Sequence, residues 1–173
     1  MMAKFDVDGI QDFLKSTFIA NNAADQMATP APDYYLSTGM TKPVKQFFTV
    51  RPENIKPQAN VMPCISVHYE GKIPVSSGIA INQKIAKRRC EASFVITAMI
   101  WNQNFSANIQ DDPADRDMQK LMENIEELLR SHPTLGGRCL WQIPGQVSIH
   151  DANMSEKTHF SVAFMELKVT AFY

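Results

Sequence analysis

The chain has 173 residues, of which 45% are hydrophobic and 20% are charged, and its formal net charge is −1. This length and composition suit one ordinary globular domain. The near-neutral charge argues against a protein that binds nucleic acid mainly through counterion release. No apolar run approaches the roughly 20 residues of a membrane span. We expect no signal peptide, because charged residues interrupt the start of the chain.

The first predicted element is a helix over residues 6–20. Ile10, Leu14 and Phe18 recur at the spacing of one helical face, which is typical of a helix that packs on a sheet. A detachable helix that binds a partner is the alternative. Asn21 and Asn22 predict the end of this helix, because asparagine tolerates the left-handed conformation of a helix cap.

Residues 23–43 have no clear period and contain three prolines around Tyr34 and Tyr35. Structureless segments longer than about 12–15 residues are uncommon inside compact domains. The segment is therefore either a loop docked on its own domain or an arm that orders against another subunit, and the sequence does not choose between them.

Two strands are predicted next, over residues 44–50 and 61–69. Pro63 confines the start of the second strand to a sheet edge or a bulge. The run Glu70-Gly71-Lys72 indicates a turn after it. A weaker strand over residues 79–85 leads into a charged stretch.

The long strand RCEASFVITAMIW, residues 89–101, is the element around which the rest is organised. Its even-numbered residues, from Cys90 to Ile100, are all small or apolar, as expected when one face of a strand lies in the core. Its alternation predicts the last strand, residues 160–173, as its partner. Both exceed the usual strand length of about 5–6 residues, so we expect them to reach toward a neighbouring subunit.

A helix is predicted over residues 113–131. Asp112 is a suitable N-cap and Pro113 suits the first helical position. Gly136 and Gly137 indicate its end. A short apolar piece near residues 139–143, a strand over 146–150 and a turn over 151–157 are expected before the last strand. The apolar stripe of the helix consists of Met118, Leu121, Met122, Ile125, Leu128 and Leu129.

These elements predict a single α+β domain over residues 1–173, with a mostly antiparallel sheet and two main amphipathic helices. The N-terminal helix falls in residues 1–22 and the irregular arm or loop in residues 23–43. The sheet occupies residues 44–173 and includes the helix over 113–131.

Two groups of residues resemble metal sites. Cys64 and His68 fall on one face of a predicted strand, but a structural zinc site needs four ligands and no second pair of suitable spacing follows. A cluster of aspartates could hold a hard cation. A helix start explains the same residues, which are Asp111, Asp112, Asp115 and Asp117. We therefore predict no metal site and no cofactor.

Catalytic residues are also not predicted. His150 and Asp151, with His159 across an expected turn, form the one candidate acid–base pair. The sequence has no nucleophile elbow of the Gly-x-Ser-x-Gly type and no glycine-rich phosphate loop. We therefore expect a protein that is not an enzyme.

One basic cluster precedes the long strand and consists of Lys84, Lys87, Arg88 and Arg89. A face that binds single-stranded nucleic acid would interleave basic and aromatic residues on one exposed surface. Phe94 instead lies on the uniformly apolar face, which predicts a core position. A solvated strand end, or a charged rim that contacts a protein partner, fits the cluster better.

Taken together, the order of elements resembles the tail terminator proteins of long-tailed bacteriophages. The similarity rests on the N-terminal helix, VMPCISVHYEG, the strand RCEASFVITAMIW, the helix MQKLMENIEELLRSHPTLGG and the end FSVAFMELKVTAFY. It covers most of residues 61–173 as a pattern of elements and includes no invariant motif. The resemblance implies a ring of six subunits that stops growth of the tail tube and joins the tail to the head.

The resemblance also implies the partners and the location. The partners would be further copies of the chain, the tube protein, a neck or head-completion protein and, in a contractile tail, the sheath. DNA would pass through the ring without sequence-specific contacts, and no membrane is involved. The location would be the tail–neck junction of the virion, and the host cytoplasm during assembly.

The residues expected at a subunit or partner interface are Tyr34, Tyr35, Lys84, Lys87, Arg88, Arg89, Trp101, Phe172 and Tyr173. Other functions stay open from the sequence. They are another ring-forming component of the tail or neck, an intracellular enzyme of unknown type, and a module that binds single-stranded nucleic acid.

Overall fold

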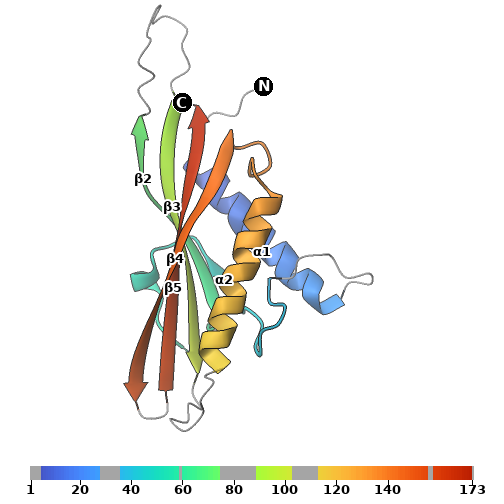
Figure 1. The fold of residues 1–173 in the computed structure, drawn as a ribbon, viewed down its shortest axis with the longest axis vertical. Coiled ribbons are helices and arrows are strands. Elements are labelled where there is room, and N and C mark those ends of the chain that lie inside the picture. Colours follow the sequence, from blue (N-terminus) through green and yellow to red (C-terminus); the bar gives the residue numbers. More distant parts are fainter. Residues whose placement is uncertain are drawn as a thin grey trace, which may run out of the picture.

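The computed structural model describes residues 5–27, 36–58, 60–74, 89–102, 113–155 and 158–172. Within them the chain forms two long helices, five strands and one 3-10 helix (Figure 1). Neither long helix of these ranges is apolar enough over sufficient length to cross a membrane. In chain order the elements are α1 (Val7–Met27), β1 (Gln46–Phe48), the 3-10 helix η1 (Pro52–Asn54), β2 (Cys64–Pro74), β3 (Arg89–Asn102), α2 (Pro113–Ser131), β4 (Trp141–Ser155) and β5 (Thr158–Phe172).

The strands form one open sheet in the order β1-β2-β3-β5-β4. β1 is parallel to β2, and the other neighbouring strands are antiparallel. β3 pairs with β5 along its whole length, from Arg89 opposite Phe172 to Asn102 opposite His159. The prediction that the long strand and the last strand are partners is therefore confirmed, and these two strands form the middle of the sheet.

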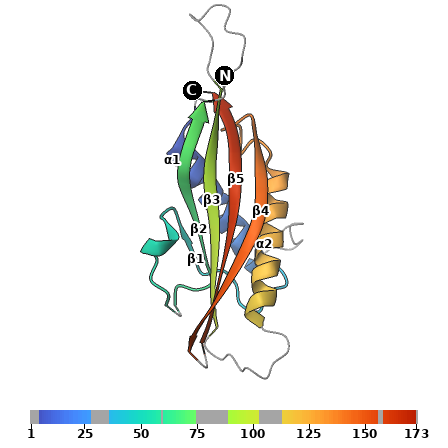
Figure 2. The ribbon, with the colours of Figure 1, turned by 60° about the vertical axis from the view of Figure 1, so that its left-hand side comes forward.

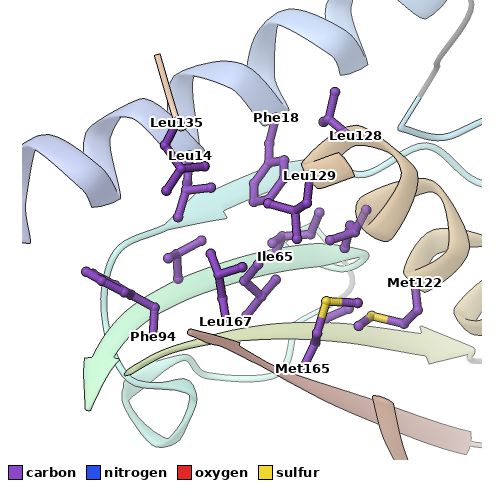
Figure 3. Close-up of a cluster of buried hydrophobic side chains, with 14 of the residues drawn as sticks. Leu14, Phe18, Ile65, Phe94, Met122, Leu128, Leu129, Leu135, Met165 and Leu167 are labelled. Carbon is purple, nitrogen blue, oxygen red and sulfur yellow. The ribbon is translucent and has the colours of Figure 1, made fainter. Parts of the chain in front are cut away.

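Both helices lie on the same side of the sheet (Figure 1 and Figure 2). The main core fills the space between them, where Phe18 of α1, Leu129 of α2 and Ile65 of β2 come together (Figure 3). The fold is thus the predicted α+β class with a mostly antiparallel sheet. The residues of the long strand that the alternation assigned to the core are buried, namely Cys90, Ala92, Phe94, Ile96, Ala98 and Ile100. On β5 the buried face consists of Ala163, Met165, Leu167, Val169 and Ala171.

α2 has the predicted bounds, and all six residues of its predicted apolar stripe are buried. The carboxylate of Glu126 accepts a hydrogen bond from the guanidinium of Arg130 at 2.6 Å on the exposed side. The chain then turns through three residues with positive φ, Leu135, Gly136 and Gly137. At Gly136 a Cβ would lie 2.7 Å from the ring of Phe13 on α1, so glycine allows the two segments to pack closely.

α1 is longer than predicted, because it continues through Asn21 and Asn22 to Met27. The Nδ2 of Asn21 donates to the carbonyl oxygen of Thr17 at 2.9 Å, and the Nδ2 of Asn22 donates to that of Val44 at 2.9 Å. The predicted helix end is therefore wrong. Both side-chain amides are satisfied by partners within or beside the helix, so these asparagines do not form a cap.

The irregular segment 23–43 divides into parts. Its first residues belong to α1, and Tyr34 and Tyr35 lie outside the described residues. The part that follows docks on the same chain, because the Nδ2 of Asn124 on α2 donates to the carbonyl oxygens of Leu36 and Thr38 at 3.1 and 3.0 Å. The sequence left open whether this segment is a loop docked on its own domain or an arm that orders against another subunit. For residues 36–41 the structure shows a docked loop.

Two predictions about the first strands need correction. β1 is shorter than residues 44–50, and β2 begins at Cys64 and continues through the predicted turn to Pro74. A register shift between Tyr69 and Gly71 marks a β-bulge. The bulge accommodates Glu70 as an extra residue, so the glycine that indicated a turn instead lies within a continuous strand. The predicted strand over residues 79–85 lies outside the described residues.

The third correction concerns β4, which is one strand of 15 residues rather than a short apolar piece, a short strand and a turn. A register shift between Pro144 and Val147 inserts one extra residue against β5. The extra residue reverses the alternation of faces, so no single period runs through the strand. This is why the pattern of the sequence divided it.

Candidate interaction surface

The face of the sheet opposite the helices, which we call the open face, is the candidate functional surface. It follows from the alternation of strand residues, because every residue beside a core position points the other way. Its position relative to the helices is visible in Figure 2. The registers place the odd-numbered residues of β3, from Arg89 to Trp101, and the even-numbered residues of β5, from Phe160 to Phe172, on this face. They also place there Ser66, His68 and Ile73 of β2 and Trp141 and Ile143 of β4.

One end of the open face is covered by the chain itself. Ile55 and Met62, from the connection between β1 and β2, pack there on Cys64 and Met99 in a second buried cluster. The hydroxyl of Ser66 donates to the carbonyl oxygen of Val50, which holds this connection against the sheet. We call this half the covered end.

The other half, the exposed end, presents apolar side chains to solvent. Ile73, Ile143 and Trp141 are 71%, 56% and 41% exposed. Ile73 and Trp141 belong to one row that crosses the sheet through Glu91 and Thr170. Contiguous exposed apolar surface on a monomer often marks a contact with a partner. Here Trp141 and Ile143 are neighbours on β4, whereas β3 and β5 separate them from Ile73.

The structure fixes the direction of Trp141 and Ile143 through the residue between them. Gln142 is buried on the helix side, where its Nε2 donates to the carbonyl oxygen of Leu129 at 2.6 Å. Its backbone nitrogen donates to the carbonyl oxygen of Pro133 at 3.0 Å. Because Gln142 is anchored at the end of α2, its two neighbours must point to the open face.

The charges at the exposed end are mixed. The Nζ of Lys168 lies 3.9 Å from a carboxylate oxygen of Glu91, and the hydroxyl of Ser93 donates to Glu166 at 3.0 Å. The guanidinium carbon of Arg89 lies 5.1 Å from the centre of the Trp141 ring, which is the distance of a cation–π contact. This surface combines apolar residues with charges of both signs, which is typical of a protein contact.

The predicted interface residues divide into three groups in the structure. Arg89 and Phe172 lie opposite one another at the exposed end. Trp101 is at the covered end, where it packs half-buried on the second cluster. The others lie outside the described residues, and they are Tyr34, Tyr35, Lys84, Lys87, Arg88 and Tyr173.

The sequence reasoning missed Ile73, Trp141 and Ile143. Ile73 follows the turn that the sequence predicts at residues 70–72, so the strand pattern gives it no face. Trp141 and Ile143 alternate with Gln142, and that signal was present, but it spans only three residues before Pro144. Which side of such a short alternation faces solvent depends on where α2 ends, and this cannot be found from the strand alone.

The candidate metal ligands do not converge. The sulfur of Cys64 contacts the sulfur of Met62 at 3.4 Å, whereas the Nε2 of His68 lies 3.0 Å from a carboxylate oxygen of Glu70. Among the described residues no group of three His, Cys, Asp or Glu side chains could hold a metal ion. Of the aspartate cluster, Asp117 accepts hydrogen bonds from Thr41, and Asp111 and Asp112 lie outside the described residues.

The candidate acid–base pair is also separated. His150 is paired with Val162, whereas His159 is paired with Asn153, three rungs further along the hairpin of β4 and β5. The ring of His150 instead lies 5.8 Å from the ring of Phe164 on the open face. The three thiols are buried, and burial raises the pKa of Cys64 to about 12 and that of Cys139 to about 11. Thiols that stay protonated are poor nucleophiles.

A concavity of about 430 Å³ lies on the outer side of α2. It is lined by three carboxylates and one guanidinium, from Glu123, Glu126, Glu127 and Arg130, together with Ser131. Glu123 and Glu126 already accept hydrogen bonds from Lys120 and Arg130 on the same helix. This arrangement is a solvated helix surface with charge pairs at helical spacing.

Comparison with models of known protein families gives no match, and comparison with curated proteins gives none either.

Proposed function

We propose that the chain is a structural subunit of a ring that closes the end of a bacteriophage tail tube. The proposal joins the resemblance of the sequence to tail terminator proteins with the half-covered sheet of the fold. The observation that carries it is the exposed end of the open face, where Ile73, Trp141 and Ile143 lie beside paired charges. Such a surface supports contact with another folded subunit.

A closed ring is the arrangement that fits a surface of this kind on a structural subunit. A repeated head-to-tail contact either closes into a ring or continues as a filament. The near-zero net charge of the chain opposes self-association only weakly. The resemblance supplies the copy number of six, the tube protein below and the neck or head-completion protein above, with the sheath beside the ring in a contractile tail.

Binding of single-stranded nucleic acid fits the same surface less well. Arg89 and Trp141 do form a basic and aromatic pair, as stacking platforms do. Glu91, however, lies in the same row as Trp141, Glu166 lies further along the same face, and both would repel phosphates. A protein partner, by contrast, can pair with charges of both signs.

Imaging of assembled particles with a label on this protein tests the proposal. We expect the label at the tail–neck junction in a ring of six copies. With the gene inactivated, heads and tubes should accumulate separately, because nothing stops the tube or joins it to the head. Tails of normal length that are joined to heads in the absence of the protein would refute the function.

A matched pair of variants tests the surface. Trp141→Glu and Ile143→Glu place a charge at the exposed end of the open face, whereas Ile19→Glu changes an apolar residue of α1 that is 42% exposed. We expect the first two variants to fold and to fail in joining heads to tails, and the third to assemble normally. Normal joining by the first two would exclude this surface from the contact.

A further inference from the structure

The edges of the sheet differ in how they are protected. Among the described strands β3 and β5 are internal, so unpaired backbone groups lie along the outer side of β1, the part of β2 beyond β1, and the outer side of β4. β1 has three residues, and an edge strand this short offers little for pairing. β1 covers β2 from Cys64 to Ser66, and no other described strand pairs along that side. An unpaired strand edge can add another strand unless something blocks it.

The outer edge of β2 is blocked in several ways. The Nε2 of Gln11 on α1 donates to the carbonyl oxygen of Val67 at 3.0 Å, directly after the end of β1. The bulge between Tyr69 and Gly71 bends the edge, and Lys72 follows it. Pro74, the last residue of the strand, has no amide hydrogen to donate. Bulges, lysine and proline are the features that natural proteins use to prevent edge pairing.

β4 is protected over its first residues only. The backbone nitrogen of Gln142 donates to Pro133, and Pro144 and the bulge follow. From residue 146 to residue 155 the sequence QVSIHDANMS contains no proline, lysine or arginine. No described strand pairs with this side of β4, and in Figure 1 and Figure 2 the far end of the strand lies clear of α2.

The backbone of this stretch directs donors outward. The backbone N–H of Gln142 points away from β5, toward Pro133. In an antiparallel strand the backbone N–H groups of every second residue point to the same side. The bulge between Pro144 and Val147 shifts the alternation by one residue. The amides of Val147 and Ile149 therefore point to the open edge. The side chain of Ile149 is 39% exposed beside it.

We infer that the open edge of β4 pairs with the same edge of a second copy of this chain. Antiparallel pairing centred on Ile149 joins the two sheets and exchanges hydrogen bonds between the two Ile149 residues. A second copy is the favoured occupant because the other described edges of the chain are short, in β1, or blocked, in β2. A contact between identical edges also closes on itself as a dimer and does not propagate.

The side chains are compatible with this register. Ile149 faces Ile149 of the second copy, and β-branched pairs stabilise neighbouring strands. On the open face Ser148 meets His150 of the second copy, so a hydroxyl faces an imidazole. No like charges are brought opposite one another from residue 146 to residue 151. The pairing concerns the free protein and does not depend on the proposed ring.

Native mass measurement and amide hydrogen exchange, over a range of concentrations of the full chain, test the inference. We expect a monomer that becomes a dimer as concentration rises. In the dimer the amides of Val147 and Ile149 should exchange more slowly, while those along the edge of β2 stay unchanged. Ile149→Lys should weaken the dimer about tenfold or more, because lysine at an edge opposes pairing.

Ile19→Lys is the matched control, since Ile19 is 42% exposed and lies on α1, away from the edge; we expect it to dimerise like the natural chain. If Ile149→Lys does not fold, Ser148→Lys replaces it, because Ser148 is already exposed. A natural chain that stays monomeric at millimolar concentration would overturn the inference. So would equal dimerisation of all variants, or assembly directly to six copies, and the last result would still support the proposed function.

Discussion

At the scale of single residues, Ile125 is the clearest test of the core. It lies in the middle of the buried side of α2 and has no exposed surface. Its removal leaves a cavity that neighbours on two layers would have to fill. We expect Ile125→Ala to lower the free energy of unfolding by about 2–5 kcal/mol in chemical denaturation. Glu127→Ala, on the exposed side of the same helix, should change it by less than about 0.5 kcal/mol. Equal small changes would mean that α2 does not cover the core.

Cys64 gives a second prediction at this scale, through pH. Burial raises its pKa from 9.0 to about 12, so the folded chain keeps the thiol proton to higher pH than the unfolded chain does. This contribution to stability is complete below pH 9 and is lost as pH rises toward about 12. The loss should reach about 1.4 kcal/mol per pH unit.

The measurement compares unfolding free energies of the natural chain and Cys64→Ala between these pH values. The variant loses packing at every pH, but its stability should fall less steeply with alkali. Parallel curves for the two proteins would show that the thiol ionises as easily in the folded state as in the unfolded state.

At the scale of elements, α2 also holds the connection that leads into β1. A carboxylate oxygen of Asp117, which is buried, accepts hydrogen bonds from the backbone nitrogen and the hydroxyl of Thr41 at 2.9 and 3.1 Å. We expect Asp117→Ala to cost about 1–3 kcal/mol, because it leaves these donors without their acceptor. The amide of Thr41 should then exchange faster, whereas amides of β3 stay protected.

Glu123→Ala is the control for this prediction. Glu123 forms an exposed pair with Lys120 on the same helix, and such pairs contribute little. Its removal should leave the exchange at Thr41 unchanged. If Asp117→Ala behaved in the same way, the connection would be held by the contacts of Asn124 instead.

The same scale explains how much of the fold the sequence predicts. α2 was predicted with correct bounds because its cap, proline, period and terminal glycines are all local. The pairing of β3 with β5 followed from two long alternating patterns. β4 was divided, because a bulge reverses its alternation, and α1 was ended too early, because the partner of Asn22 lies on a distant part of the chain. For both β4 and α1, the sequence alone lacks the contacts with distant parts of the chain that set the observed bounds.

At the scale of the whole molecule, the candidate surface was only partly predictable. Arg89 is predicted at an interface as part of the basic cluster, and Phe172 as part of the long last strand, and the two residues lie opposite one another on the open face. Ile73, Trp141 and Ile143 became visible only when the sheet showed which face the two helices leave uncovered. Whether an apolar strand residue is core or surface depends on the layer beside it, and the strand itself does not encode that layer.

The central position of β5 has a consequence for the synthesis of the chain. β5 is the last of the described elements to be synthesised, yet it lies between β3 and β4 and pairs with both. Until it emerges, β3 has only β2 beside it and β4 has no partner strand. The backbone nitrogen of Phe5 also donates to the carbonyl oxygen of Phe172. This hydrogen bond of the first described residue can therefore form only after the last described residue has been synthesised. The sheet can therefore be completed only after β5 has emerged, and until then one side of β3 and both sides of β4 are open to non-native pairing.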